Sequence, residues 1–166
     1  MKPTKHPLTR ALRRRAVAVL GALALLAGLS AAVTYHAQAA TTTGAITGYE
    51  GLCLDDRSAS TADFNPIQVY TCNGTSAQQW TVGAGNTLQV LGMCLDVNAA
   101  GTANGTLVDL YTCNGTAAQV WEPQSNGELL NPNSGKCLDD TGYGGSGTQV
   151  QIWTCADTSN QQWSLP

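Results

Sequence analysis

Three stretches of the chain carry the same side chains, and these could bind a neutral polyhydroxylated ligand. Each stretch holds an aspartate within a Cys-Leu-Asp motif and, further along, an aromatic residue two positions before a second cysteine. A carboxylate accepts hydrogen bonds from two neighbouring hydroxyls, and an aromatic ring stacks on an apolar face made of ring C–H groups. This combination suits a sugar. The aspartates are Asp55, Asp96 and Asp139, and the aromatic residues are Tyr70, Tyr111 and Trp153.

The three stretches belong to an internal repeat of about 41 residues. Each copy reads Gly-x-Cys-Leu-Asp, then aromatic-x-Cys, then Gln-x-Trp. The first cysteines of successive copies lie 41 and 43 residues apart, and the motif tryptophans lie 41 and 42 residues apart. Insertions between copies are therefore nearly absent, and one structural unit is used three times. The repeats cover about residues 44–86, 87–128 and 129–166 and are called the first, second and third repeat below.

Residues 1–39 are predicted to be a secretory signal peptide. A basic stretch (1–15) precedes a small, apolar run (16–29), and Ala37-Gln38-Ala39 fits a cleavage site. The apolar run has 14 residues, fewer than the roughly 20 that a spanning helix needs, so a membrane anchor is the less favoured alternative. Arg13-Arg14-Arg15 leaves general and twin-arginine export both open. We expect a secreted, extracellular protein with residues 40–166 as its domain and no membrane partner after cleavage.

Cleavage would leave Arg57 and Lys136 against 11 acidic residues, a formal charge of 2 − 11 = −9. Nucleic acid is disfavoured as a partner because phosphates are bound by clusters of Lys and Arg. Both histidines, His6 and His36, would also leave, which excludes Ser-His-Asp and Cys-His nucleophile systems and zinc sites with a histidine ligand. Adjacent carboxylates on a strand point to opposite faces and could not flank one glycosidic bond. We expect no enzyme activity, no cofactor and no metal.

Six cysteines, two in each repeat, allow 15 pairings in principle. Equivalent units should close equivalent loops, which selects the pairs Cys53–Cys72, Cys94–Cys113 and Cys137–Cys155, with separations of 19, 19 and 18 residues. Metal binding by thiolates is the rival interpretation, but the spacing Cys-x-x-Cys does not occur. Each disulfide would stabilise the fold by about 3 kcal/mol on the chain-entropy model.

Short alternating runs at 67–70, 107–111 and 149–153, separated by Asn-Gly and Gly-Gly turns, predict an all-β fold. A period near 41 also suits a propeller blade, but propellers usually need at least four blades. Three units of about four short strands would close as a threefold barrel capped by hairpins. We therefore expect a β-trefoil with threefold pseudo-symmetry.

The three Gln-x-Trp motifs, each preceded by Cys-Leu-Asp and a second cysteine, resemble those of the ricin B-type lectins. These include the family 13 carbohydrate-binding modules of bacterial secreted enzymes. The resemblance covers Gly44 to Pro166. It implies a β-trefoil with one sugar pocket per repeat, and xylan-like or galactose-containing glycans as ligands.

In this family the aspartate of Cys-Leu-Asp holds two sugar hydroxyls, and the aromatic residue stacks on the ring. The motif glutamine is expected to brace the aspartate, and Trp80, Trp121 and Trp163 are expected in the core. Carried over by position, the sugar-binding residues are Asp55, Gln68, Tyr70, Asn73 and Gln78 in the first repeat; Asp96, Asp109, Tyr111, Asn114 and Gln119 in the second; and Asp139, Gln151, Trp153, Asn160 and Gln161 in the third.

Departures from the pattern distinguish the pockets. The plant-lectin form places an asparagine directly before the motif glutamine, and only the third repeat keeps it, as Asn160; Ala77 and Ala118 stand there in the first two. Asp109 replaces an amide and would put a second carboxylate near Asp96, which raises one pKa or recruits a cation. We expect the first two pockets to be alike, the third to be distinct, and the second to be the least suited to a sugar.

These observations favour a free-standing, monomeric, secreted lectin that binds neutral glycans through up to three shallow pockets. Several weak pockets on one polysaccharide would raise the affinity through effective concentration. The alternative is a trefoil that has lost sugar binding and acts as an inhibitor or a protein-interaction scaffold, because fold alone does not decide function.

Overall fold

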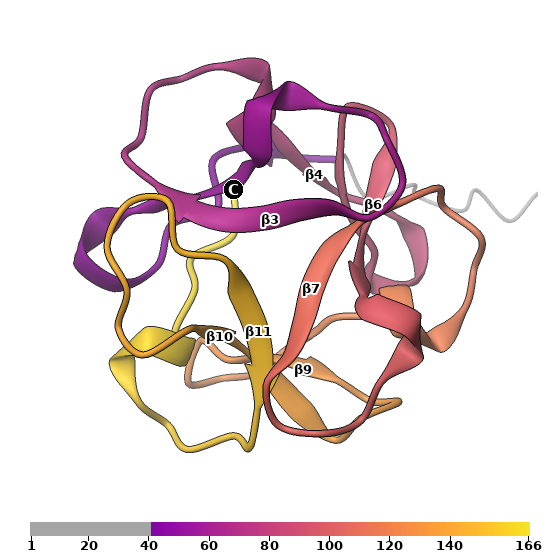
Figure 1. The fold of residues 1–166 in the computed structure, drawn as a ribbon, viewed down its shortest axis with the longest axis vertical. Helices are drawn as coiled ribbons and strands as arrows, with labels where there is room; N and C mark the ends of the chain where they lie inside the picture. Colours follow the sequence, from indigo (N-terminus) through magenta and orange to yellow (C-terminus); the bar gives the residue numbers. More distant parts are fainter. Residues whose placement is uncertain (1–40) are drawn as a thin grey trace, which may run out of the picture. The chain divides into compact units, whose positions relative to one another are not determined.

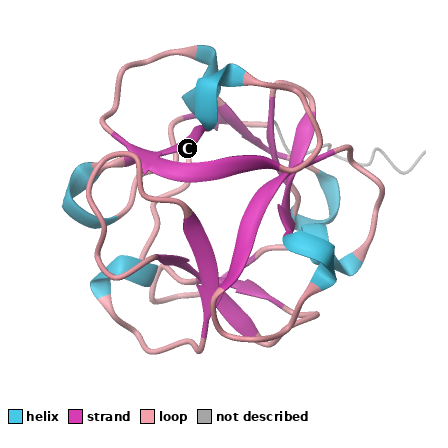
Figure 2. Cartoon of the chain, viewed as in Figure 1, coloured by secondary structure: helices cyan, strands magenta, loops and turns pink. Residues whose placement is uncertain are grey.

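The computed structural model describes residues 41–166, which form strands and short 3₁₀ turns, with no α-helix within that range (Figure 2). The predicted signal peptide lies outside the described residues. The strands are β1 (Thr43–Gly44), β2 (Cys53–Asp56), β3 (Asn65–Tyr70), β4 (Trp80–Val82), β5 (Leu88–Val90), β6 (Met93–Val97), β7 (Thr106–Tyr111), β8 (Glu122–Pro123), β9 (Leu129–Asn131), β10 (Lys136–Asp140) and β11 (Val150–Trp153). The turns are η1 (Tyr49–Gly51), η2 (Arg57–Ala59), η3 (Ser76–Gln78), η4 (Ala84–Asn86), η5 (Asn98–Ala100), η6 (Ala117–Gln119) and η7 (Ser159–Gln161).

Strands β3, β7 and β11 form a triangle around the centre of the fold (Figure 1). β7 pairs with β3 on one side and with β11 on the other, and Gln149, the residue before β11, bridges Gln68 of β3. Each of these strands is the second strand of an antiparallel hairpin: β2–β3, β6–β7 and β10–β11. The arrangement confirms the predicted β-trefoil, with one hairpin of the triangle from each repeat.

The hairpin register separates core residues from pocket residues. In β2–β3, Leu54 lies opposite Val69, and both belong to the hydrophobic core. Asp55 and Gln68 form the next pair and therefore point to the other face of the hairpin, since side chains alternate along a strand. The equivalent polar pairs are Asp96–Asp109 in β6–β7 and Asp139–Gln151 in β10–β11.

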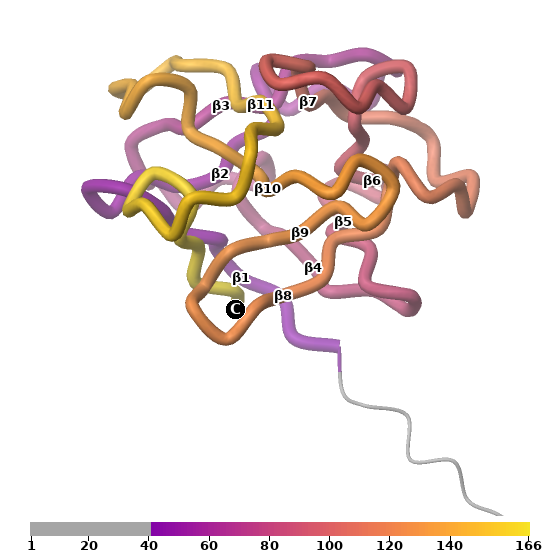
Figure 3. The backbone as a smooth tube through the Cα atoms, turned by 90° about the horizontal axis from the view of Figure 1, so that it is seen from below, coloured from indigo at the N-terminus to yellow at the C-terminus, as the bar shows by residue number. Residues whose placement is uncertain are grey.

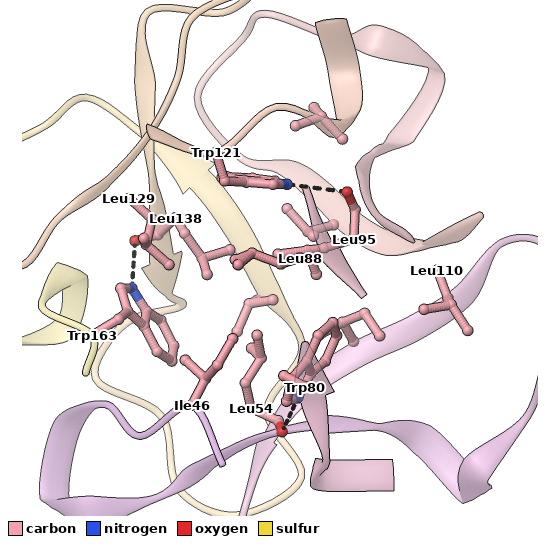
Figure 4. Close-up of a cluster of buried hydrophobic side chains, with 14 of the residues drawn as sticks. Ile46, Leu54, Trp80, Leu88, Leu95, Leu110, Trp121, Leu129, Leu138 and Trp163 are labelled. Carbon is pink, nitrogen blue, oxygen red and sulfur yellow. Dashed lines mark hydrogen bonds between the residues drawn. The ribbon is translucent and has the colours of Figure 1, made fainter. Parts of the chain in front are cut away.

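The motif tryptophans lie in the core, as the sequence predicted, with exposed fractions of 0% for Trp80 and Trp121 and 5% for Trp163. Each indole N–H donates to the leucine carbonyl of the Cys-Leu-Asp strand in its own repeat (Figure 4). The Nε1···O distances are 2.8 Å for Trp80 to Leu54, 3.0 Å for Trp121 to Leu95 and 3.0 Å for Trp163 to Leu138. The Gln-x-Trp segment is thereby tied to the strand that carries the aspartate.

The predicted cysteine pairs all form disulfides, with Cα–Cα distances of 5.1 Å. Each disulfide links the start of a hairpin's first strand to the cysteine two positions after Tyr70, Tyr111 or Trp153. The glycine that precedes each first strand has positive φ: 71° at Gly51, 80° at Gly92 and 65° at Gly135. A residue with a Cβ is strained in that conformation, which explains the glycine of Gly-x-Cys.

The first and last described segments pair with each other at the end of the fold away from β3, β7 and β11 (Figure 3). Thr47 bridges Ser164, and the Thr42 hydroxyl donates to the Pro166 carbonyl. Between residues 41 and 166, the structure holds no helix with the length and apolar character needed to cross a membrane.

Candidate functional site

Each repeat forms one surface hollow between its aspartate, its aromatic residue and a 3₁₀ turn. The hollows are called the first, second and third pocket after their repeats. Their volumes are about 360, 310 and 520 Å³, within the range of small-ligand pockets. The first is lined by Asp55, Asp56, Arg57, Ser58, Ala59, Gln68, Tyr70, Asn73, Thr75 and Ala77; the second by Phe64, Asp96, Ala99, Ala100, Tyr111, Asn114, Thr116 and Ala118; the third by Asp139, Thr141, Gly142, Tyr143, Gln151, Trp153, Ala156, Thr158, Asn160 and Gln161.

In the first pocket, two amides hold the carboxylate of Asp55. Gln68 Nε2 donates to Oδ1 at 2.8 Å, and Gln78 Nε2 donates to Oδ2 at 2.9 Å. Gln78 also accepts a hydrogen bond from the backbone N–H of Asn73 at 2.8 Å. A carboxylate has about four acceptor positions, so these two amides do not use all of those of Asp55. Tyr70 stands beside it with 40% of its surface exposed, a free aromatic face.

Arg57 lines the first pocket, although the motif-based prediction did not include it. Its Nε donates to Gln68 Oε1 at 3.0 Å, which directs the amide N–H₂ of Gln68 toward Asp55. Arg57 is one of two basic residues in 40–166, and it follows Asp55-Asp56 directly. That isolated positive charge next to two carboxylates was the available signal in the sequence.

The third pocket holds its carboxylate more tightly. Asp139 Oδ1 accepts from Gln151 Nε2 at 2.9 Å, and Oδ2 accepts from Asn160 Nδ2 at 2.9 Å and Gln161 Nε2 at 2.8 Å. Asn160 is fixed in turn by the Thr158 hydroxyl, which donates to its Oδ1 at 2.8 Å. The asparagine kept only in this repeat therefore adds a third donor to the carboxylate.

Two aromatic rings border the third pocket. Trp153 is 43% exposed and Tyr143 is 49% exposed, and Tyr143 packs edge to face against Tyr49 with ring centroids 5.2 Å apart. The sequence prediction named Trp153 and missed Tyr143. Alanine occupies the equivalent loop position in the other repeats, at Ala59 and Ala100, so comparing this position across the repeats would have found Tyr143.

The second pocket lacks the amide that faces the aspartate in the other two. Asp109 lies opposite Asp96 in the hairpin, where Gln68 and Gln151 lie in the equivalent pairs. Asp109 is 2% exposed; its Oδ2 accepts from Asn98 Nδ2, while its Oδ1 has no hydrogen-bond partner. The predicted proximity of two carboxylates is thus present.

Burial is the main cause of raised carboxyl pKa values around the pockets. It raises the pKa of Asp109 to about 6, and the negative charges of Asp96 and Asp63 add to the effect against the hydrogen bond from Asn98. Burial also raises the pKa of Asp96, against a hydrogen bond from Gln119. Asp56 and Asp140, the residues after the first and third pocket aspartates, are buried too, and desolvation raises each pKa to about 6.

The predicted residues divide into those that line a pocket and those that lie behind it. Gln78, Gln119 and Asp109 are at most 2% exposed and lie behind the lining. Gln78 acts as the brace expected for the motif glutamine. The lining residues are Asp55, Gln68, Tyr70 and Asn73 in the first pocket; Asp96, Tyr111 and Asn114 in the second; and Asp139, Gln151, Trp153, Asn160 and Gln161 in the third.

The way each aspartate is held groups the pockets differently from the sequence expectation. The first and third share a glutamine donor from the facing strand, and the second has none. The first two pockets are alike at the asparagine that follows the second cysteine. The side-chain oxygens of Asn73 and Asn114 each accept a hydrogen bond from the backbone N–H of the residue two positions later. The feature that separates the second pocket is Asp109.

The fold is a β-trefoil with one surface pocket in each repeat, and comparison with known families agrees with this class of fold. The family described as "Ricin-type beta-trefoil lectin domain" matches this chain over residues 42–163. The chain belongs to this family of carbohydrate-binding domains.

Two relatives are larger proteins, each of which contains a segment similar to this chain. Serine protease 1 of Rarobacter faecitabidus is 41% identical over 122 residues, which are 74% of this chain and 23% of that protein. A glucan endo-1,3-beta-glucosidase of Cellulosimicrobium cellulans is 60% identical over 101 residues, 60% of this chain and 18% of that protein. The chain thus spans less than a quarter of the length of either relative.

A solved structure is similar in fold and contains a sugar. It is a non-toxic homologue of type II ribosome-inactivating proteins (RIPs) from Momordica charantia (bitter gourd), in complex with alpha-methyl-D-galactoside. Its TM-score is 0.68 at 29% identity, over 75% of this chain and 47% of that one.

Proposed function

We propose that this protein is a secreted lectin that binds neutral glycans, xylan-like or galactose-containing, through its first and third pockets. The observation that carries the proposal is the shared geometry of Asp55 and Asp139. Each carboxylate is fixed by glutamine amides beneath a hollow that also presents an exposed aromatic ring. A fixed acceptor beside a stacking surface matches a ring with neighbouring hydroxyls on one edge and C–H groups on one face.

The acidic lining of the pockets argues against an anionic ligand and is compatible with a neutral one. Arg57 is the one basic residue among the lining residues, and its Nε is engaged with Gln68. The carboxylates of Asp55, Asp56, Asp96 and Asp139 outnumber this single positive charge and disfavour an anionic ligand. The three disulfides support export, because such bonds persist in oxidising compartments.

A glycan array on residues 40–166 would identify the sugar, and calorimetry on pocket variants would test the residues. We expect Asp55→Ala and Asp139→Ala each to remove the binding of one pocket and the double variant to lose nearly all affinity. Glu122→Ala is the matched control, since Glu122 is an exposed carboxylate on β8 that lines none of the three pockets. Unchanged glycan binding in the double variant would contradict the proposal and favour a scaffold role.

Trp153 provides a separate readout for the third pocket. It is exposed, whereas the three other tryptophans of the chain are at most 5% exposed. A sugar stacked on Trp153 should therefore change the tryptophan fluorescence, and Asp139→Ala should abolish the change while Asp55→Ala leaves it intact. A fluorescence change that survives Asp139→Ala would remove the third pocket from the proposal.

A further inference from the structure

Phe64 is an exposed aromatic residue in an unfavourable backbone conformation at the edge of the second pocket. Its side chain is 59% exposed, its φ is 65°, and it lines the pocket together with Asp96 and Tyr111. Its ring packs edge to face against Tyr111, with centroids 5.0 Å apart and planes inclined by 69°. Phe64 comes from the first repeat, so one repeat supplies a wall to the pocket of the next.

The same position in the other repeats is glycine. The Phe64 N–H donates to the Leu110 carbonyl at 2.8 Å, as Gly105 N–H does to Ile152 at 3.0 Å and Gly147 N–H to Val69 at 2.7 Å. All three positions have positive φ: 65°, 83° and 97°. The loop therefore has one conformation in three copies, and only the first copy places a side chain there.

A side chain at this position faces the following pocket. A Cβ placed on Gly105 would lie 3.8 Å from Gln151 Oε1 and 3.9 Å from the Trp153 ring, two lining residues of the third pocket. The loop is held in place by its neighbours: Asp63 Oδ1 accepts from the Thr112 N–H at 2.7 Å and hydroxyl at 2.9 Å, as Asn104 does from Thr154 at 3.0 and 3.1 Å. Phe64 is thus aimed at the second pocket by the fold.

Phe64 costs stability where glycine would not. A bulky residue in the left-handed region is strained by about 1 kcal/mol or more, and strain of this kind gathers at functional sites. Since 59% of the side chain stays exposed, burial does not offset the strain fully. A ligand that covers the Phe64 ring would bury more of it and so offset the strain.

The rest of the second pocket is the least polar of the three. Besides Asn114 and Thr116, it is lined by Ala99, Ala100 and Ala118, where the third pocket has Gly142, Tyr143 and Asn160. Its aspartate has Asp109 opposite in place of a glutamine donor. The pocket therefore offers fewer fixed hydrogen-bonding groups and less polar surface than its neighbours.

We propose that the second pocket binds sugars that carry an aromatic substituent, and that Phe64 determines this specificity by contacting the substituent. The two inclined rings form a corner in which a sugar can stack on Tyr111 while an aryl group lies against Phe64. The inference rests on the proposed lectin function and deepens it, since it assigns a ligand class to the pocket that the general sugar pattern fits least.

Phe64 is the only phenylalanine in the 166 residues, so ¹³C-labelled phenylalanine gives a single NMR reporter of the second pocket. The probes are 4-nitrophenyl and methyl glycosides of galactose and of xylose, titrated into the labelled protein. We expect the aryl glycosides to shift the Phe64 ring signals and to bind this pocket about threefold to tenfold more tightly than the methyl glycosides, the range typical of one aromatic pair.

Three variants distinguish a direct contact between the Phe64 ring and the ligand from a general effect of changing a residue in a loop. Amide chemical shifts around the second pocket give its affinity in each variant. Phe64→Gly recreates the residue of the other two repeats and should remove the preference for aryl glycosides; Phe64→Leu keeps an apolar side chain without the ring and should lose most of it. Leu91→Gly is the control, because Leu91 is also an exposed apolar residue with positive φ, 39% exposed at 51°, and lines none of the three pockets.

The outcomes distinguish this inference from the proposed function. Binding at the first and third pockets without any response of Phe64, or an aryl preference that persists in Phe64→Gly, overturns the inference alone. Failure of the protein to bind any glycan on the array, together with no response to the glycoside probes in any amide signal, overturns both. A preference lost in Phe64→Gly and retained in Leu91→Gly supports it.

Discussion

At the scale of single residues, Asp109 is the substitution that most changes a pocket. It replaces the glutamine that faces the aspartate in the other repeats, and its buried Oδ1 has no hydrogen-bond partner. The facing groups are Asp96 on β6, Asp63 before β3 and Asn98 on η5; of these only Asn98 favours the ionised form. The carboxyl pKa is about 6 in the folded protein, whereas that of an unperturbed aspartate is 3.8. The ionised form therefore destabilises the fold.

We predict that Asp109→Asn stabilises the protein at pH 7, because an amide can donate to Asp96 and has no charge to bury. The gain should be about 1–3 kcal/mol, since one pKa unit corresponds to about 1.4 kcal/mol. The penalty in the wild type is fully present above pH 6 and disappears as the pH falls below 3.8, so the gain should shrink toward pH 4. Urea unfolding from pH 4 to 7 measures it.

Glu122→Gln is the control for Asp109→Asn, because it removes the same charge from an exposed strand. It should change stability by less than about 0.5 kcal/mol at any pH in this range. A gain for Asp109→Asn that is as large at pH 4 as at pH 7 would show that ionisation of Asp109 is not its cause.

At the scale of elements, the Gln-x-Trp segment holds the Cys-Leu-Asp strand from behind. Gln78 binds the carboxylate of Asp55, and Trp80, two residues later, binds the carbonyl of Leu54. The two contacts fix adjacent residues of β2, so the pocket carboxylate is positioned by the core. This coupling gives the motif its physical reason: the glutamine and the tryptophan must keep their spacing to reach neighbouring groups on one strand.

We predict that Trp80→Phe destabilises the protein by about 2–4 kcal/mol, from a cavity and an unpaired buried carbonyl at Leu54. Trp80 is 0% exposed, so water does not replace the lost donor. Trp153→Phe is the comparison, since Trp153 is 43% exposed and should cost less than about 0.5 kcal/mol. Equal unfolding midpoints in urea for the two variants would refute a core role for the Gln-x-Trp tryptophan.

The sequence predicted the features that each repeat specifies within itself. The family resemblance put Asp55 and Gln68 in one pocket, the cysteine spacing selected the disulfides, and the repeated tryptophans were assigned to the core. The contribution of Phe64 was missed because it depends on contact between repeats: its loop lies against the pocket of the next repeat. Position-by-position comparison with Gly105 and Gly147 would have singled it out, but only the fold shows what it faces.

At the scale of the whole molecule, the pseudo-threefold arrangement sets how several pockets can act together. The pockets are built on the hairpins β2–β3, β6–β7 and β10–β11, which extend from three sides of the central triangle (Figure 1). We expect a short oligosaccharide to occupy one pocket at a time, because the pockets lie on different sides of the triangle. A polysaccharide or a surface with many chains can occupy two of them, and the second contact then benefits from effective concentration.

We predict that the protein binds a polymeric form of its glycan at least about tenfold more tightly than a short oligosaccharide of the same sugar, since linked weak sites commonly gain 10²–10⁴. Asp139→Ala should reduce that ratio toward one while the oligosaccharide still binds the first pocket, because a single neutral-sugar pocket gives no such gain. Glu122→Ala should keep the wild-type ratio. Calorimetry with the oligosaccharide and affinity electrophoresis with the polymer measure the two quantities. A ratio near one in the wild type would mean that the pockets act independently, and the threefold arrangement would then serve the core alone.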